Sequence, residues 1–233
     1  MTQRTGAGLL RRDARIHIFD VDHTLTRYST GTLYARAGLR DGMVSLRQLA
    51  SMPFYYLLYR IGRLSLGTVT KKIKPLQGYT RKELVDLAYR AWEAGGHDNV
   101  FKSARAYLDA CRAAGAEIAL ATSSFDVIIE PLQEALGIHH VISSVLEFDR
   151  EDRSTGWLAG GPCYAEAKAD RIVALLHELG NDPEECAFYS DSFHDLPGLR
   201  TVGMPVAVNP DILLKRVARR EGWPILRWDR EKT

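Results

Sequence analysis

Apolar and polar positions alternate in blocks along this chain and predict strands and helices in turn. Short apolar runs, which are typical of buried strands, occupy 16–19, 117–121, 140–145, 186–189 and 204–208. Between the later runs, apolar residues recur with the spacing of amphipathic helices at 100–114, 126–136, 165–179 and 211–221. Strands that alternate with helices predict a parallel sheet with right-handed crossovers.

The block from 28 to 96 has a different pattern. It contains no convincing strand, and its apolar residues follow helical spacing, for example at Leu84, Leu87 and Ala88. Thr80 and Glu83 form the signature of a capping box that opens the last helix of this block. Because the block interrupts the α/β pattern after the first strand, we expect a helical cap inserted into the core.

The predicted fold class is therefore α/β, with a doubly wound, Rossmann-like parallel sheet as the core and an inserted all-helical cap domain. We place the core at 1–27 and 97–233 and the cap at 28–96. The polar, glycine-rich stretch 149–162 predicts a hairpin or loop within the core. Ligands bind to such sheets at the carboxyl ends of the strands, so residues there are the first candidates for a site.

Composition and charge are ordinary for a globular protein, and they mainly exclude classes of protein. Of 233 residues, 45% are hydrophobic and 26% are charged, and the formal net charge of +2 does not indicate a nucleic-acid partner. Nothing in the chain reaches the roughly 18 consecutive apolar residues of a membrane span. The arginine-rich start, 1–15, has no long apolar core, so a secretory signal is not expected, although an organellar transit peptide is an alternative.

Cysteine usage indicates a reducing environment. The three cysteines, Cys111, Cys163 and Cys186, are widely spaced and form no Cys-x-x-Cys pair. Zinc and redox sites therefore have little support. Free thiols suit a reducing compartment, and we predict a cytoplasmic protein.

The candidate chemistry begins where the first strand ends. Asp20 and Asp22 follow the apolar run one residue apart, and Thr24 comes next. Alone, this pattern has a simple structural explanation, a strand followed by a turn. It becomes specific because further candidates follow at strand ends or at the start of a helix, namely Thr122, Lys168, Asp191 and Asp195.

These residue types suit the hydrolysis of a phosphate ester. Asp20 is the candidate nucleophile, because a carboxylate that attacks phosphorus splits one difficult hydrolysis into two easier steps. Asp22 lies two residues on and points to the same side of the sheet. It is the candidate general acid and base, which protonates the leaving alcohol and then deprotonates water.

A carboxylate that attacks a phosphate dianion meets strong repulsion, which predicts a cation, and Mg²⁺ suits oxygen ligands. The predicted metal ligands are Asp20, the backbone carbonyl of Asp22, Asp191 and, through water or by orienting the others, Asp195. Lys168 would neutralise the phosphoryl oxygens and restrain the nucleophile. Thr122 would bind the phosphate through its hydroxyl, with Ser123 and the backbone N–H groups beside it.

In this order, the motifs resemble those of the haloacid dehalogenase superfamily of phosphohydrolases. The helical insert after the first motif, CYAEAK at 163–168 and YSDSFHDLP at 189–197 look like the branch that contains phosphoserine phosphatase. The similarity spans about 16–210, nearly the whole chain. It implies a Mg²⁺-dependent phosphatase that acts on a small phosphorylated metabolite through a phosphoaspartate intermediate.

The departures from that branch concern the substrate. Phosphoserine phosphatases usually carry a glutamate shortly after the first motif to bind the substrate ammonium, whereas 27–30 here reads Arg-Tyr-Ser-Thr. The glycine pair that usually follows the second-motif hydroxyl is replaced by Ser123 and Ser124. The cap arginine that holds the serine carboxylate has no clear equivalent, although Lys72 falls near it. We therefore expect a substrate other than phosphoserine.

Several further residues have both a functional and a structural interpretation. His23 is a candidate contact to the substrate, and otherwise shapes the turn of the first motif. Lys72 or Lys74 in the cap is a candidate substrate contact. The aromatic stretch 54–59 is either cap core and a wall over the site or a membrane-facing surface, and the basic residues of 215–220 suit the solvated face of an amphipathic helix.

Two other functional classes stay open. A phosphotransferase of the same fold would pass the phosphoryl group to a second substrate in place of water. A protein that binds phosphate or a membrane surface without catalysis would also keep the fold, although the complete set of acids argues against it. The sequence does not indicate the oligomeric state.

Overall fold

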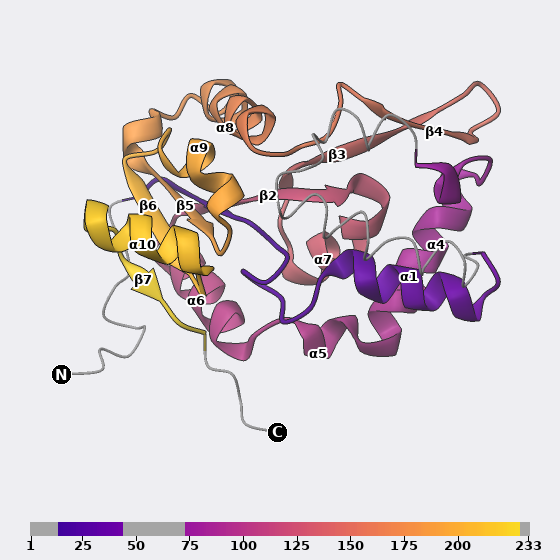
Figure 1. The fold of residues 1–233 in the computed structure, drawn as a ribbon, viewed down its shortest axis with the longest axis horizontal. Coiled ribbons are helices and arrows are strands. Elements are labelled where there is room, and N and C mark those ends of the chain that lie inside the picture. The colour runs from indigo at the N-terminus through magenta and orange to yellow at the C-terminus, as the bar shows by residue number, and fades with distance from the viewer. Residues whose placement is uncertain (1–13, 44–72, 229–233) are drawn as a thin grey trace.

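The computed structural model describes residues 14–43 and 73–228. In this part of the chain, a seven-stranded sheet has the order β4-β3-β2-β1-β5-β6-β7 (Figure 1). Its strands are β1 (Ile16–Phe19), β2 (Glu117–Phe125), β3 (His140–Phe148), β4 (Ser154–Ala159), β5 (Cys186–Ser190), β6 (Met204–Val208) and β7 (Ile225–Leu226). Neighbouring strands pair in parallel except β3 and β4, which are antiparallel. The predicted α/β core is therefore confirmed, and the stretch 149–162 contains the turn and second strand of a hairpin.

Helices cover both faces of the sheet, as a doubly wound fold requires. On one face lie α6 (Lys102–Ala113) and α7 (Asp126–Leu136), and on the other lie α8 (Glu166–Glu178), α9 (Leu196–Leu199) and α10 (Ile212–Glu221). Successive side chains of a strand point to opposite faces. Ile16 and Ile18 of β1 therefore pack with the second group of helices, whereas Phe19 packs with the first.

The strand order places a topological switch point at the centre of the sheet. From β1 the chain builds outward through β2 and β3, and it later returns to the opposite side of β1 as β5. Asp20 directly follows β1 and Asp191 directly follows β5, so both lie at this switch point. Open α/β sheets bind their ligands in the crevice outside such a point.

The regular elements that the structure describes in the inserted block are helices and helical turns. It forms α1 (Thr30–Arg40), the short turn η2 (Lys74–Leu76), α4 (Arg81–Ala91) and the π-helical turn η3 (Trp92–Gly96), which leads into α5 (His97–Asn99). The predicted capping box is present, because Glu83 N donates to Thr80 Oγ1 over 3.2 Å and Thr80 N donates to the Glu83 carboxylate over 2.8 Å. The inserted helical cap is therefore confirmed as part of the fold class.

The described cap packs on the β3–β4 hairpin and on α7. In Figure 1, the hairpin extends past α4, which lies beside α1. The turn before α4 pairs with the hairpin, since Gly78 N donates to Ser154 O and Ser154 N donates to Tyr79 O, each over 2.8 Å. Beneath them, Leu84 and Leu146 belong to one buried cluster. The division into 28–96 and the rest of the chain stays a prediction. In space, the β3–β4 hairpin packs against the cap.

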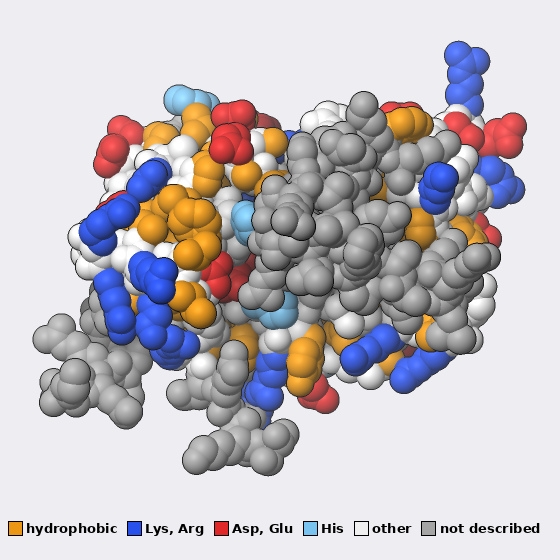
Figure 2. All heavy atoms as spheres, viewed as in Figure 1, with side chains coloured by type: hydrophobic (Ala, Val, Ile, Leu, Met, Phe, Trp, Pro, Cys, Tyr) orange, Lys and Arg blue, Asp and Glu red, His pale blue; other side chains and the backbone are white. Residues whose placement is uncertain are grey.

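The surface of α10 has the amphipathic pattern that its sequence predicts. Its buried side is Leu214, Val217 and Ala218, whereas Arg216, Arg219 and Arg220 are exposed. Figure 2 shows Lys and Arg side chains gathered beside hydrophobic side chains over this helix. Across the described ranges, no helix is long and apolar enough to cross a membrane. The aromatic stretch 54–59 lies outside those ranges.

Candidate active site

Asp20 stands at the end of the central strand with its side chain buried. Its backbone N–H donates to the carbonyl of Tyr189 over 2.9 Å, which continues the pairing of β1 with β5 by one residue. Behind it, the rings of Phe19 and Tyr189 stack with centroids 4.3 Å apart. Only 6% of Asp20 is exposed. The sheet therefore holds this carboxylate in a fixed place that bulk water hardly reaches.

Lys168 of α8 joins two of the predicted carboxylates. Its Nζ lies 3.0 Å from Asp20 Oδ1 and 2.8 Å from Asp195 Oδ1, and only 2% of the lysine is exposed. Asp195 Oδ2 also accepts a hydrogen bond from Ser190 Oγ over 2.7 Å. Both oxygens of Asp195 are thus engaged, and this acid holds the ammonium group beside Asp20.

Thr24 links the carboxylates that follow β1 and β5. Its hydroxyl donates toward Asp20 Oδ2 at 3.2 Å and Asp191 Oδ1 at 3.3 Å. The same hydroxyl oxygen accepts a hydrogen bond from Asp191 N over 3.0 Å. The sequence places Thr24 in the first motif, but its bridging position depends on the pairing of β1 with β5.

The site carries more negative charge than one lysine balances. Burial raises the pKa of Asp20 to about 7, against the opposing effect of Lys168 and with added repulsion from Asp195 and Asp22. Burial likewise raises the pKa of Asp191 to about 8, and Asp20 adds to the rise. Burial lowers the pKa of Lys168, but Asp195 and Asp20 raise it by more, so the ammonium group stays charged.

The donor set at this edge of the sheet fits Mg²⁺. Among the residues that the structure describes, no group of three or more His, Cys, Asp or Glu side chains forms a metal cage. Mg²⁺ does not need one, because it is usually held by one or two carboxylates together with water and phosphate oxygens. Asp20 and Asp191 approach the same hydroxyl, so their carboxylates lie close together at this edge of the sheet.

Asp22 belongs to a second network that includes the start of the cap. Its Oδ1 accepts from Thr30 N over 2.8 Å and Thr30 Oγ1 over 2.9 Å, and its Oδ2 accepts from Ser29 Oγ over 3.0 Å and Ser124 Oγ over 3.1 Å. Its carboxylate shares none of these donors with Asp20. The three partner residues were not predicted from the sequence, because only the fold brings Ser124 of β2 to the first turn of α1.

The second motif lies in a bulge of β2. The strand was predicted to end at Ala121, but it continues to Phe125, with a register shift against β3 between these two residues. Such a bulge releases backbone groups from the sheet and is common beside active sites. The buried Thr122 hydroxyl accepts from Ser124 N over 3.1 Å, which leaves its own proton to donate elsewhere. Ser123 is exposed at this edge.

The remaining candidates lie apart from these networks. His23 is exposed, adopts the left-handed φ of 65°, and places Nδ1 3.2 Å from the carbonyl of Arg27. These features give it a place in the turn, and its contact with a substrate stays a prediction. Lys72 lies outside the described residues, whereas Lys74 is exposed on η2.

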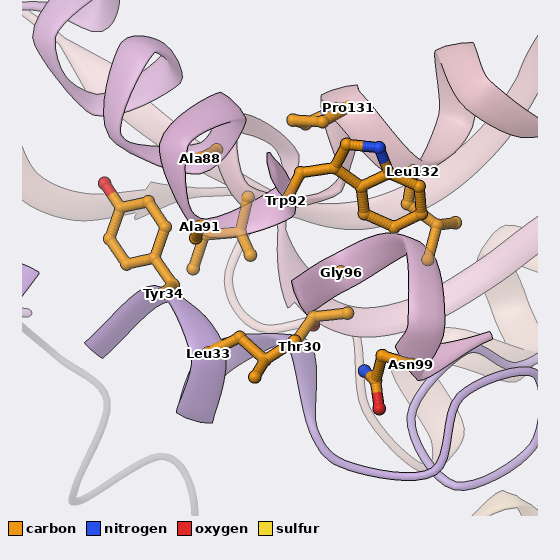
Figure 3. Close-up of a pocket in the computed structure, with 11 residues that line it drawn as sticks. Thr30, Leu33, Tyr34, Ala88, Ala91, Trp92, Gly96, Asn99, Pro131 and Leu132 are labelled. Atoms are coloured by element: carbon orange, nitrogen blue, oxygen red, sulfur yellow. The ribbon is translucent and has the colours of Figure 1, made fainter. Parts of the chain in front are cut away.

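A small cavity lies where α1, α4, η3 and α7 meet (Figure 3). The Trp92 ring lies beside Leu132 at one side, and Thr30 of the second network lines it from α1. Its volume of about 20 Å³ is room for a single water molecule. The cavity is thus a feature of the packing between cap and core and does not admit a metabolite.

Comparison with known proteins places most of the chain in one family. A model of haloacid dehalogenase-like hydrolases matches residues 18–200, which include every predicted motif residue. A protein of Neisseria meningitidis serogroup C (strain 8013) named histidinol-phosphatase is 31% identical over 214 residues, which cover 90% of this chain and 96% of that protein.

Solved structures agree at the level of the fold. A protein of unknown function from Bordetella pertussis Tohama I superposes with a TM-score of 0.83 at 26% identity, over 91% of this chain and 98% of that one. A phosphoserine phosphatase described as a phospho-aspartyl intermediate analogue superposes with a TM-score of 0.65 at 17% identity, over 94% and 95% of the two chains. The second likeness concerns the fold alone.

Proposed function

Because the chain belongs to the haloacid dehalogenase-like hydrolase family, as its motifs indicated, we propose that it is a Mg²⁺-dependent phosphatase that hydrolyses a small phosphate monoester through a phosphoaspartate at Asp20. The observation that carries this proposal is the buried pair of Lys168 Nζ and Asp20 Oδ1 at 3.0 Å, with Thr24 tying Asp20 to Asp191 on its other side. A nucleophile, a fixed cation and a second acid thus meet at the switch point of the sheet.

In the first step, Asp20 attacks phosphorus, and the bond from phosphorus to the alcohol oxygen breaks. Lys168 lies against the nucleophile and offsets negative charge on the phosphoryl oxygens. The Thr122 hydroxyl donates a hydrogen bond to one of those oxygens. Bound Mg²⁺, held by Asp20, Asp191 and the backbone carbonyl of Asp22, would supply the further positive charge. The product alcohol leaves with a proton from Asp22.

Asp22 suits proton transfer because its partners can serve both of its protonation states. Three of its four donors are hydroxyls, from Ser29, Thr30 and Ser124. A hydroxyl rotates and can accept as well as donate. Protonated Asp22 can therefore donate to one hydroxyl while Thr30 N still holds the other oxygen. In the second step, Asp22 takes a proton from the water that cleaves phosphoaspartate, which releases phosphate and restores both acids.

For the substrate, we propose a phosphorylated alcohol other than phosphoserine. After the first motif, the Arg27 guanidinium lies 5.6 Å from the centre of the Phe101 ring, and 64% of Tyr28 is exposed. Ser29 and Thr30 are committed to Asp22. This stretch therefore presents no acid to a substrate ammonium group. The relative named histidinol-phosphatase makes histidinol phosphate the first candidate. It also carries an ammonium group, which would need a partner outside this stretch, and it differs from phosphoserine in lacking the carboxylate.

A screen of phosphorylated metabolites with Mg²⁺ tests the proposal. It would include histidinol phosphate, phosphoserine and the chromogenic p-nitrophenyl phosphate, with phosphate release as the readout. We expect hydrolysis of p-nitrophenyl phosphate that a chelator abolishes, and a higher kcat/KM for histidinol phosphate than for phosphoserine. No Mg²⁺-dependent release from any phosphate monoester would contradict the proposed activity. Phosphate appearing on an added alcohol in place of water would assign a phosphotransferase.

A further inference from the structure

A tryptophan from the end of the chain reaches the first motif. Trp228 follows β7 and is 4% exposed. Its indole Nε1–H donates to the backbone carbonyl of Thr24 over 2.6 Å. The residue lies beyond 18–200, the part that the family model matches. The C-terminal segment of this chain therefore touches a loop whose motif belongs to the family.

Trp228 is held rigidly enough to fix that loop. Its backbone N–H donates to Asn209 Oδ1 over 3.2 Å, and Asn209 N in turn donates to the carbonyl of Leu226 over 3.0 Å. Its ring packs on Tyr107 of α6 with centroids 5.4 Å apart. The indole is thus anchored from β6, from β7 and from the helix beneath the sheet.

The contact has consequences on the other side of Thr24. The carbonyl of Thr24 faces Trp228, while its hydroxyl lies between Asp20 and Asp191. A fixed backbone at Thr24 therefore fixes the hydroxyl that spaces the two carboxylates. We propose that Trp228 is a positioning residue of the active site, which acts through Thr24 to set the arrangement of Asp20 and Asp191 for Mg²⁺. This inference rests on the proposed function.

Loss of the indole N–H leaves a buried carbonyl without its donor. Either a water molecule then takes the place of the indole N–H, or the backbone of the loop shifts and moves the hydroxyl of Thr24. Replacing a residue that orients a metal ligand by hydrogen bonding typically lowers metal affinity or activity by about tenfold to a hundredfold. We expect an effect of that size on Mg²⁺ binding and on kcat.

The test compares Trp228→Phe with Trp223→Phe. Phenylalanine at 228 keeps a ring against Tyr107 but removes the donor to Thr24. Trp223 is a matched control, because it lies on the same segment but packs against the opposite core cluster. Isothermal titration with Mg²⁺ alone measures binding without turnover, and hydrolysis of p-nitrophenyl phosphate gives kcat and KM separately.

We expect Trp228→Phe to weaken Mg²⁺ binding and lower kcat by about tenfold or more, with a smaller change in KM, while Trp223→Phe retains wild-type values. Wild-type affinity and turnover in folded Trp228→Phe would overturn the inference and leave the proposed function intact. A wild-type protein that neither binds Mg²⁺ nor hydrolyses the ester would instead overturn the proposed function.

A measurement on the wild-type protein covers the case in which Trp228→Phe does not fold. The ¹⁵N-labelled indole N–H signal of Trp228 should shift when Mg²⁺ is added, because positive charge beside the Thr24 hydroxyl changes the hydrogen bond that the Thr24 carbonyl accepts. The signal of Trp223 should stay in place. An unshifted Trp228 signal at saturating Mg²⁺ would overturn the inference without any substitution.

Discussion

At the scale of single residues, charge balance explains the arrangement of the site. Four acids surround the end of β1, and Lys168 contacts two of them, Asp20 and Asp195. Thr24 separates Asp20 from Asp191, and cap hydroxyls hold Asp22 in a network of its own. Each acid thus has a different set of neighbours, and in the proposed mechanism these sets, more than the shared carboxyl chemistry, distinguish nucleophile, metal ligand and proton carrier.

The raised pKa values predict how pH affects the stability of the metal-free protein. Asp20 and Asp191 ionise near their ordinary pKa of 3.8 when unfolded, but near about 7 and about 8 when folded. Between these limits the folded state binds protons that the unfolded state has lost, so the free energy of unfolding falls as pH rises from about 4 to about 8. Chemical denaturation of metal-free protein across this range measures the fall.

Asp191→Asn removes one of the two groups and should make this decline shallower. Asp109→Asn, on the exposed face of α6, is the control and should keep the wild-type slope. Mg²⁺ should stabilise the wild-type protein most at the upper end of the range, where both acids are ionised. A slope that Asp191→Asn leaves unchanged would argue against a protonated Asp191 in the metal-free fold.

The residues that could be predicted from the sequence are those whose place depends on one strand or helix end. Asp20 and Asp191 could be predicted because each directly follows an apolar run. Ser124 and Trp228 were not, because their partners lie 102 and 204 residues away along the chain. Only the packed fold brings such pairs together, and no local pattern marks them.

At the scale of elements, the cap and the hairpin form one packed unit beside the core. Asp126 of α7 links the two through its carboxylate. Its Oδ1 accepts a hydrogen bond from Leu146 N over 2.9 Å, and its Oδ2 accepts one from Arg81 Nη1 over 3.0 Å. The Arg81 guanidinium also lies 4.3 Å from the centre of the Phe148 ring. One side chain thus joins the cap helix α4, the helix α7 and the strand β3.

Replacing Asp126 with Ala should destabilise the protein by about 1–3 kcal/mol, because the N–H of the buried Leu146 loses its acceptor. Urea denaturation measures the free energy of unfolding. Asp109→Ala removes an acid whose side chain is 74% exposed and which forms an ion pair with Arg112 in the same helix, so we expect a change within about 0.5 kcal/mol. Equal effects of the two substitutions would contradict this role of Asp126.

Most elements were predictable because their hydrophobic period is clear. The strand at 204–208 and the helix at 126–136 have the predicted bounds. The extension of β2 through the polar residues 122–124 was missed, because a bulge continues a strand without apolar residues. The strand β7 at 225–226 is too short to carry a period and is defined only by its pairing with β6.

At the scale of the whole molecule, two connections join the cap to the core, and they are tied together. Thr26 pairs with Val100, and Arg27 N donates to the carbonyl of Asn99 over 2.8 Å. The Asn99 side chain holds the backbone of Tyr28 through two hydrogen bonds of 2.8 Å. The first motif, the start of α1 and the return from the cap therefore form one structure, so movement of the cap would be transmitted to Asp22.

The alternation of apolar runs with helical spacing was enough to predict this architecture. The aspartate motifs mark strand ends at one edge of the sheet, whereas Lys168 lies in the helix α8. The contact of the hairpin with the cap was not predictable, since it depends on how far β3 and β4 extend beyond the core. The motifs also leave the substrate unassigned, because they carry the residues of the proposed reaction and not those of the cap.

The proposed mechanism requires that Asp20 becomes phosphorylated during turnover. The most direct measurement mixes excess ³²P-labelled phosphate monoester with the enzyme and Mg²⁺, quenches with acid within one turnover, and maps protein-bound label by mass spectrometry. We predict label on the peptide that contains Asp20 in the wild-type protein. Asp20→Asn should carry no label and should lose turnover by about a thousandfold or more. Label on another residue, or near-wild-type turnover by Asp20→Asn, would contradict the account.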